Sequence, residues 1–181
     1  MKRKNAMLDM VICSLSAAMI TICSYIAIPF SAIPITAQGF AVCLIAAVFG
    51  AKRGVVSVSV YLILGAIGIP VYSGFTGGIG ILFGVTGGYF IGFLITALTV
   101  GTVSDKSAFR PWQVMLSMIM GTVLCYAFGT LWYTLFYNDG QSVHSVLASC
   151  VYPFIIPDLI KIILATVATL RLKPKLLRII K

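Results

Sequence analysis

The chain has few charged side chains, and none of them is a glutamate. Only 9% of its 181 residues are charged, whereas an ordinary globular domain carries about 25%. Hydrophobic residues make up 60% of the sequence. A chain of this composition lacks the polar groups needed to cover a folded surface in water. A water-soluble domain is therefore excluded, and lipid is the expected solvent.

The chain also lacks the side-chain sets of common catalysts and metal sites. His144 is the single histidine, and the five cysteines contain no C-x-x-C pair, so neither a zinc site nor a disulfide framework is indicated. No G-K-[ST] follows the glycine-rich stretch, which excludes a phosphate loop and an ATPase. We therefore expect no metal, no cofactor and no enzymatic activity.

Basic residues are the main charged type, and they give a net charge of +9. A nucleic-acid partner is one explanation, but twelve of the thirteen Lys and Arg cluster between apolar runs, at 2–4, 52–53, 106–110 and 171–181. Basic residues beside membrane spans mark the cytoplasmic side. Membrane orientation therefore explains the charge, and we expect no nucleic acid. The C-terminal cluster also suits contact with anionic lipid headgroups.

Six apolar runs fill most of the chain, and a spanning helix needs about 20 residues. Threading these runs from an inner N-terminus places all clustered basic residues on one side and leaves the three outer loops without any. An odd number of spans would put one basic terminus outside. The sequence thus predicts one domain, 1–181: an all-α membrane protein, a compact bundle of six transmembrane helices with cytoplasmic N- and C-termini. The runs are 7–28, 37–51, 54–70, 81–103, 112–137 and 147–170.

Asp158 and Lys161 are ionisable residues inside the last apolar run. Their i, i+3 spacing puts them on one helical face, and each charge costs about 2.5–3.5 kcal/mol at the centre of a span. An ion pair that only holds the bundle together is one interpretation. A polar site facing an enclosed cavity is favoured, because intramembrane ionisable residues are usually functional. If the helix begins at Pro157, Asp158 lies near its positive end and the pair lies in the outer half of the membrane.

Three further polar or aromatic residues are candidates for ligand contact. Thr36 and Gln38 follow a proline turn at the mouth of the second apolar run, where capping a helix and hydrogen bonding to a ligand are equally good interpretations. Trp132 belongs to an aromatic group at the outer end of the fifth run. An interfacial aromatic belt explains that group best, and stacking on a planar ligand is the alternative for Trp132.

Glycines are concentrated between residues 74 and 92. Gly84, Gly88 and Gly92 form a G-x-x-x-G-x-x-x-G row, which permits helices to approach closely. Close helix packing is the favoured role, and a loop whose backbone amides approach a ligand is the second. From the residues alone, the chain is a small membrane protein with a mixed-charge site near its outer face, and its substrate stays open.

Four motifs, taken in order, resemble the BioY family. They are Pro34–Gln38 (PITAQ), Tyr61–Gly74 (YLILGAIGIPVYSG), Gly84–Tyr89 (GVTGGY) and the Asp158/Lys161 pair. The resemblance covers nearly the whole chain. A glycine row alone would be weak evidence for the resemblance, but the four motifs together are specific for the family.

The resemblance implies the biotin-specific substrate-binding subunit of an energy-coupling factor transporter, in a bacterial cell membrane. Such a subunit captures biotin from outside without catalytic activity. A separate transmembrane coupling subunit and two cytoplasmic ATPase subunits are its implied partners, and the binding subunit is thought to topple in the membrane to deliver its site inward.

The resemblance also implies a ligand-binding set. Lys161 would neutralise the biotin carboxylate and Asp158 would accept from the ureido N–H groups, and the exchange of these roles stays open. Further hydrogen bonds and a lid are implied for six other positions: Thr36, Gln38, Thr86, Gly87, Gly88 and Tyr89.

The sequence departs from the family pattern in two places. Val85 stands where the glycine loop of the family commonly has proline. The docking row of small residues on the first helix, often A-x-x-x-A in this class of transporter, is replaced by Cys13, Ala17 and Thr21, or by Ser14 and Ala18.

Two alternatives remain at this stage. A binding subunit for another vitamin would share the fold but not the ligand. A structural membrane scaffold that uses the glycine row for assembly would bind no ligand, so substitution of Asp158 or Lys161 would alter stability alone.

Overall fold

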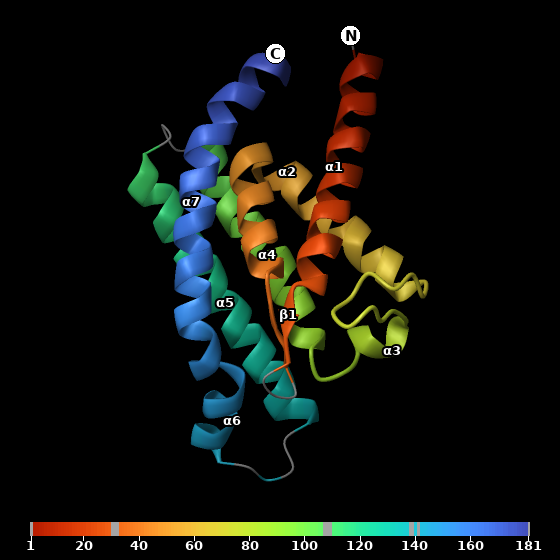
Figure 1. Ribbon diagram of the computed structural model, residues 1–181, viewed down its shortest axis with the longest axis vertical. Helices are drawn as coiled ribbons and strands as arrows, with labels where there is room; N and C mark the ends of the chain where they lie inside the picture. The colour runs from red at the N-terminus through yellow and green to blue at the C-terminus, as the bar shows by residue number, and fades with distance from the viewer. Residues whose placement is uncertain (1, 30–32, 107–109, 138–139, 141, 181) are drawn as a thin grey trace.

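The computed structural model describes residues 2–29, 33–106, 110–137, 140 and 142–180, and most of them are helical (Figure 1). A two-residue strand pair interrupts the helices, with Ala27 opposite Thr36. The elements in chain order are α1 (Lys2–Tyr25), β1 (Ala27–Ile28), β2 (Ile35–Thr36), α2 (Gln38–Ala66), α3 (Ile79–Leu82), α4 (Gly87–Lys106), α5 (Pro111–Phe136), α6 (Val143–Cys150) and α7 (Tyr152–Ile180).

Helices long and apolar enough to cross a membrane confirm the predicted helical membrane architecture. Among the described residues there are five: Ala6–Tyr25, Gln38–Ala66, Gly87–Lys106, Pro111–Phe136 and His144–Leu176, the last of which includes α6 and most of α7. The second of these is broken at Gly50, where φ is 84° and ψ is 177°. Its two arms, 38–49 and 51–66, correspond to the separate runs predicted over 37–51 and 54–70.

Glycine allows the sharp change of direction inside α2. A positive φ is unstrained only for glycine, so Gly50 ends the first arm and the helix restarts at Ala51. The Asp105 carboxylate accepts a hydrogen bond from the Ala51 N–H at 3.0 Å. Gly101 of α4 lies against the backbone of Ala51, where a Cβ atom would collide. The turn is therefore fastened to the end of α4.

Two predicted runs begin later than expected or are divided. The run expected over 81–103 becomes the short α3 and then α4, which starts only at Gly87. The run expected over 147–170 is divided into α6 and α7, and α7 begins at Tyr152. Pro157 therefore lies inside α7 and does not start it. The interpretation that Asp158 occupies a first helical turn was wrong, because the helix already contains a turn before it.

Helix α4 packs against both α2 and α5, and these are the most extensive contacts between elements. The glycine row makes the second contact possible. A Cβ atom on Gly88 would collide with Trp132 and the Phe128 carbonyl, and one on Gly92 would collide with Cys125. The predicted role of these two glycines in close helix packing is confirmed.

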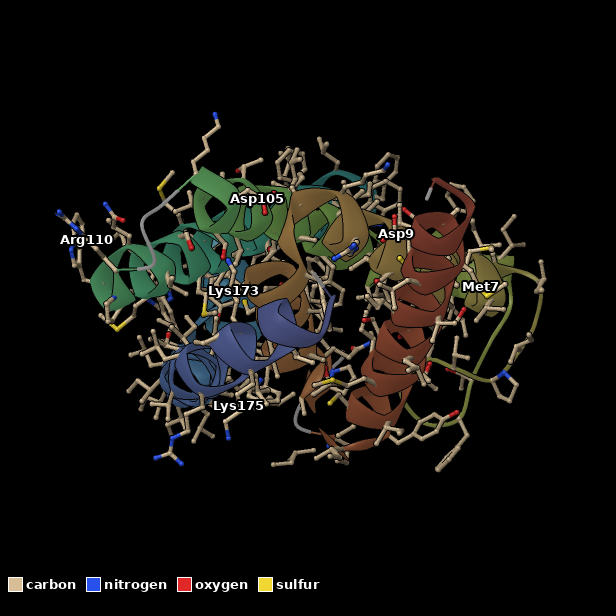
Figure 2. All side chains as sticks on the ribbon, turned by 90° about the horizontal axis from the view of Figure 1, so that it is seen from above. Met7, Asp9, Asp105, Arg110, Lys173 and Lys175 are labelled. Atoms are coloured by element: carbon tan, nitrogen blue, oxygen red, sulfur yellow. The ribbon has the colours of Figure 1, made fainter. Side chains whose placement is uncertain are left out.

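Helix α1 begins, and helix α7 ends, at the same end of the molecule (Figure 1). The view onto this end in Figure 2 shows charged side chains distributed across it, among them Asp9, Asp105, Arg110, Lys173 and Lys175. Arg53 and Asp9 form an ion pair of 2.7 Å here, which joins α2 to α1. The β1–β2 hairpin and the loop after α2 lie away from this end (Figure 1).

Candidate functional site

A cavity of about 380 Å³ lies among α2, α4, α5 and α7, within the range of small-molecule sites. The β2 strand and the loop between α2 and α4 also contribute to its walls. Its polar lining residues are Thr36, Gln38, Tyr72, Ser73, Thr76, Thr86, Tyr89, Thr96, Thr122, Tyr126, Asp158 and Lys161.

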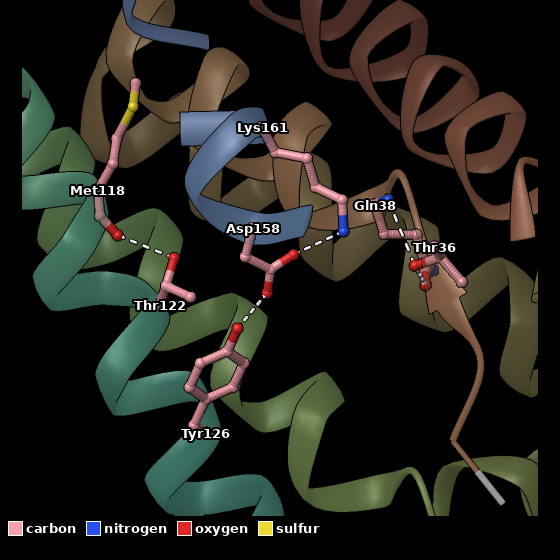
Figure 3. A network of polar contacts seen from close by, with 7 residues as sticks. All are labelled: Thr36, Gln38, Met118, Thr122, Tyr126, Asp158 and Lys161. Carbon is pink, nitrogen blue, oxygen red and sulfur yellow. Dashed lines mark hydrogen bonds and ion pairs between the residues drawn. The ribbon is translucent and has the colours of Figure 1, made fainter. Parts of the chain in front are cut away.

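Asp158 and Lys161 form an ion pair in this cavity, with 2.6 Å between Nζ and Oδ1 (Figure 3). They lie i, i+3 on α7, so the predicted shared face is confirmed. The other carboxylate oxygen of Asp158 accepts a hydrogen bond from the Tyr126 hydroxyl of α5. Both charged side chains are 18% exposed. The charges are thus partly desolvated and oriented by two helices.

Thr36 and Gln38 form a second polar group in the cavity wall, at β2 and the start of α2. The Thr36 hydroxyl donates to Oε1 of Gln38 at 2.9 Å. The side-chain amide of Gln38 donates to the Tyr61 hydroxyl, and Gln38 is only 5% exposed. In Figure 3 the Lys161 ammonium points toward this group. A ligand between the two polar groups would meet a carboxylate, an ammonium, an amide and hydroxyl groups.

The remaining walls are apolar. Phe90, Phe93, Phe154 and Ile162 line the cavity, and two buried thiols, Cys43 and Cys125, join them. Apolar walls with a few convergent polar groups are typical of pockets for small organic ligands. The arrangement suits a ligand with polar or charged groups at one point and an apolar body beside them.

The predicted glycine-loop residues divide into two groups. Thr86 and Tyr89 line the cavity. The Tyr89 hydroxyl also donates to the Cys150 carbonyl at 2.8 Å, which holds α4 against the end of α6. Gly87 and Gly88 are not among the lining residues, and both lie against Trp132. Their position supports the packing of α4 on α5 rather than contact with a ligand.

Trp132 lies behind the glycine loop and does not line the cavity. Its indole N–H donates to the Gly84 carbonyl at 3.0 Å, and its ring contacts Phe136. The structure therefore does not bring Trp132 to a position for stacking on a ligand in the cavity. It fixes the loop that carries Thr86.

The small residues proposed for docking on α1 mostly face inward. Cys13 and Ala17 are 6% and 1% exposed, and the Cys13 thiol lies 3.8 Å from the Arg53 carbonyl of α2. The first two members of the row Cys13, Ala17 and Thr21 are therefore buried in the protein, and a role of this row in docking stays a prediction. Ser14 and Ala18, the alternative pair, are exposed.

Sequence reasoning missed Tyr126, the partner of Asp158 from another helix. It also missed Thr122, one turn earlier on α5, which lines the same cavity. A signal was present: a tyrosine near the middle of an apolar run must find a hydrogen-bond partner for its hydroxyl. The aromatic residues from Phe128 onward in the same run are typical of a membrane interface, and this interpretation left Tyr126 unassigned.

The family model described as "BioY family" matches residues 1–178. The chain belongs to the BioY family. One relative is "Biotin transporter BioY" of Thermotoga maritima, which is 36% identical over 156 residues, covering 86% of this chain and 90% of the relative. Another is "Biotin transporter BioY2" of Lactococcus lactis, 36% identical over 159 residues, covering 88% and 86%.

A solved structure is also similar to this BioY-family chain. Its title is "Crystal structure at 2.1 A of the S-component for biotin from an ECF-type ABC transporter". The TM-score is 0.85 at 27% sequence identity, and the match covers 96% of this chain and 95% of the other. The likeness thus extends over the whole fold, including the helices that form the cavity.

Proposed function

We propose that this protein binds biotin and is the substrate-specific subunit of an ECF-type transporter that takes up biotin. Its membership of the BioY family, whose relatives are named biotin transporters, supports this function. The single observation that carries the ligand site is the cavity in which Asp158, Lys161 and Tyr126 are joined. The protein is a transporter subunit and not an enzyme.

The cavity offers a chemical partner for each part of biotin. The ureido ring carries two N–H donors and a carbonyl acceptor, and the carboxylate carries the charge. In one orientation Asp158 accepts from the ureido N–H groups and Lys161 pairs with the carboxylate. In the exchanged orientation the ureido carbonyl accepts from Lys161. The phenylalanine walls suit the fused ring and the aliphatic chain.

Further contacts are assigned to the groups beside the pair. Thr36, Gln38, Thr86 and Tyr89 all line the cavity and supply hydroxyl and amide groups. Gly87 and Gly88 hold the glycine loop in place through their packing on Trp132. These six residues and the ion pair make up the proposed site, and Tyr126 joins it as the residue that orients Asp158.

Six membrane crossings follow if α1, the two arms of α2, α4, α5 and α7 each cross the bilayer. This arrangement keeps all the clustered basic residues on one side, which would be the cytoplasmic side of a bacterial cell membrane. The common end of the first and last helices in Figure 1 supports it. The cavity would then open toward the outside, where biotin arrives.

This chain has no phosphate loop, so ATP hydrolysis in an ECF-type transporter would be carried out by partner subunits. We assign this role to a transmembrane coupling subunit and two cytoplasmic ATPase subunits. Ser14 and Ala18, being small and exposed on α1, are better candidates for contact with the coupling subunit than the buried Cys13 and Ala17.

Competition binding tests the ligand directly. Purified protein in detergent is titrated with labelled biotin, and unlabelled biotin, thiamine and riboflavin are added as competitors. Saturable binding that only unlabelled biotin displaces is the expected result. Displacement by another vitamin at lower concentration would assign the cavity to that vitamin, and the absence of saturable binding in folded protein would favour a structural scaffold.

A further inference from the structure

A second hollow lies between α4 and α5, at the end of the molecule where the first helix begins and the last helix ends. Its volume is about 420 Å³, and it shares no lining residue with the cavity described above. On both helices the lining residues recur at helical spacing, so the hollow is a groove along the two. They are Thr102, Val103, Lys106, Trp112, Gln113, Leu116, Ser117 and Met120.

One end of the groove is polar. Lys106 is exposed, and it makes no ion pair with the described residues. The Oε1 atom of Gln113 is buried, yet within the described part of the chain it accepts no hydrogen bond. Buried acceptors are normally satisfied, so this atom is available to a donor from outside the chain, either a water molecule or a bound lipid. The groove therefore offers a cation for an anionic group and an acceptor for a hydroxyl or amine.

The rest of the groove is apolar. Leu116 and Met120 lie on successive turns of α5 and are 50% and 56% exposed. The two hydroxyls along the wall are occupied, since Ser117 donates to the Val114 carbonyl and Thr102 to the Thr99 carbonyl. Trp112 lies beside the polar end and is 56% exposed. Tryptophan is enriched at the depth of the lipid headgroups, so this end of the groove is expected to lie at the membrane interface.

We propose that this groove binds one acidic glycerophospholipid of the phosphatidylglycerol type from the leaflet at this end of the protein. The phosphate pairs with Lys106, a glycerol hydroxyl donates to Gln113 Oε1, and one acyl chain lies along Leu116 and Met120. Charge complementarity decides the class of lipid. Phosphatidylcholine has no net charge and no donor, and phosphatidylethanolamine has a donor without net charge.

Quenching of Trp112 by brominated acyl chains reports occupancy of the groove. The Trp132→Phe variant leaves Trp112 as the single tryptophan. It is placed in nanodiscs of phosphatidylcholine in which a small fraction of brominated phosphatidylglycerol, phosphatidylethanolamine or phosphatidylcholine is the quencher. Each preparation is first shown to be folded by size-exclusion chromatography and circular dichroism, so that a loss of fold is detected without relying on biotin binding.

Brominated phosphatidylglycerol is expected to quench at about fivefold lower mole fraction than phosphatidylcholine, because one lysine near a membrane surface contributes about that factor. Lys106→Gln should abolish this preference for phosphatidylglycerol. Gln113→Leu should reduce the preference, while quenching by brominated phosphatidylcholine should persist. Lys52→Gln, an exposed lysine at the same end outside the groove, is the matched control and should retain it.

Three results with the lipids would overturn the proposal, and a fourth result, with a soluble phosphate, would also do so. One is equal quenching by phosphatidylglycerol and phosphatidylcholine in the parent. Another is equal loss of preference in Lys52→Gln and Lys106→Gln, which would reveal general surface charge and no site. The third is a preference for phosphatidylethanolamine. Water-soluble glycerol 3-phosphate should not relieve the quenching, and relief would show that the groove binds a free phosphate.

Discussion

Two lysines on α7 point into the protein and make different kinds of contact. Lys161 pairs with Asp158 beside an open cavity of about 380 Å³. Lys173, three turns further along, donates to the Ser104 carbonyl at 3.0 Å and to the Ser104 hydroxyl at 2.6 Å. It is only 8% exposed and lines neither hollow.

The Lys173 group is closed within the protein. The Ser104 hydroxyl itself donates to the Ala47 carbonyl at 2.6 Å, so one chain of hydrogen bonds joins α7, α4 and α2. The Lys161 group, in contrast, has an open space on one side. A charged residue inside a membrane protein therefore indicates a ligand site when part of its hydrogen-bonding capacity faces a cavity. When the protein surrounds the residue on all sides, it indicates a structural contact between helices.

Removal of the cavity lysine should have the largest effect. Lys161→Met leaves the Asp158 carboxylate without its cation and removes a charged contact to the ligand. We expect biotin affinity to fall by about 100-fold, since the loss of one member of a desolvated charge pair costs about 2–5 kcal/mol of binding. Equilibrium binding of labelled biotin measures it.

The matched control is Lys173→Met, on the same helix. It should retain parental affinity within about twofold. Equal loss of biotin binding in both variants would contradict the distinction between the two lysines.

Removal of the buried lysine should instead affect stability. Lys173→Met breaks the contacts to Ser104, and hydrogen bonds to charged groups contribute about 1.5–3 kcal/mol. We expect a lower midpoint of thermal unfolding in detergent. Lys175→Met, at an exposed position two residues away, should change the midpoint little. An unchanged midpoint of thermal unfolding in Lys173→Met would show that the contact between Lys173 and Ser104 does not stabilise the protein.

Loss of the orienting hydroxyl should have a smaller effect. Tyr126→Phe keeps the ring but removes the donor to Asp158. About tenfold weaker biotin binding is expected, because one charge-assisted hydrogen bond that fixes the carboxylate is lost. Tyr137→Phe, which removes a hydroxyl bonded to the Phe83 carbonyl outside the cavity, is the control. Equal affinities of Tyr126→Phe and the parent would remove Tyr126 from the site.

The smallest effect is expected at Trp132. Trp132→Phe keeps an aromatic ring beside Gly87 and Gly88 but loses the bond to the Gly84 carbonyl. Biotin affinity should fall by no more than about threefold, as expected for one neutral hydrogen bond that acts through a loop. A loss as large as that of Lys161→Met would mean that the indole contacts the ligand directly.

Sequence spacing was sufficient to predict the contacts of the site that lie within one helix or one turn. Asp158 and Lys161 meet because i, i+3 residues share a helical face. Thr36 and Gln38 meet because they flank the start of α2. A reversal between the runs 37–51 and 54–70 was also predicted, and the structure places the break slightly earlier, at Gly50.

Contacts between helices could not be derived in the same way. Tyr126 reaches Asp158 only because α5 and α7 are packed side by side, and 32 positions separate the two in the chain. The inward direction of Cys13 and Ala17 depends on which face of α1 meets α2. An apolar helix in lipid has no polar face to reveal this, since the side toward lipid is as hydrophobic as the side toward protein.

Locating the ligand itself tests the central claim most directly. The protein is crystallised with the selenium analogue of biotin, and anomalous scattering locates the selenium atom of its ring. We predict a single strong peak inside the cavity bounded by Gln38, Tyr126 and Asp158. A peak in the groove between α4 and α5, or elsewhere on the protein, with the cavity empty would contradict the account.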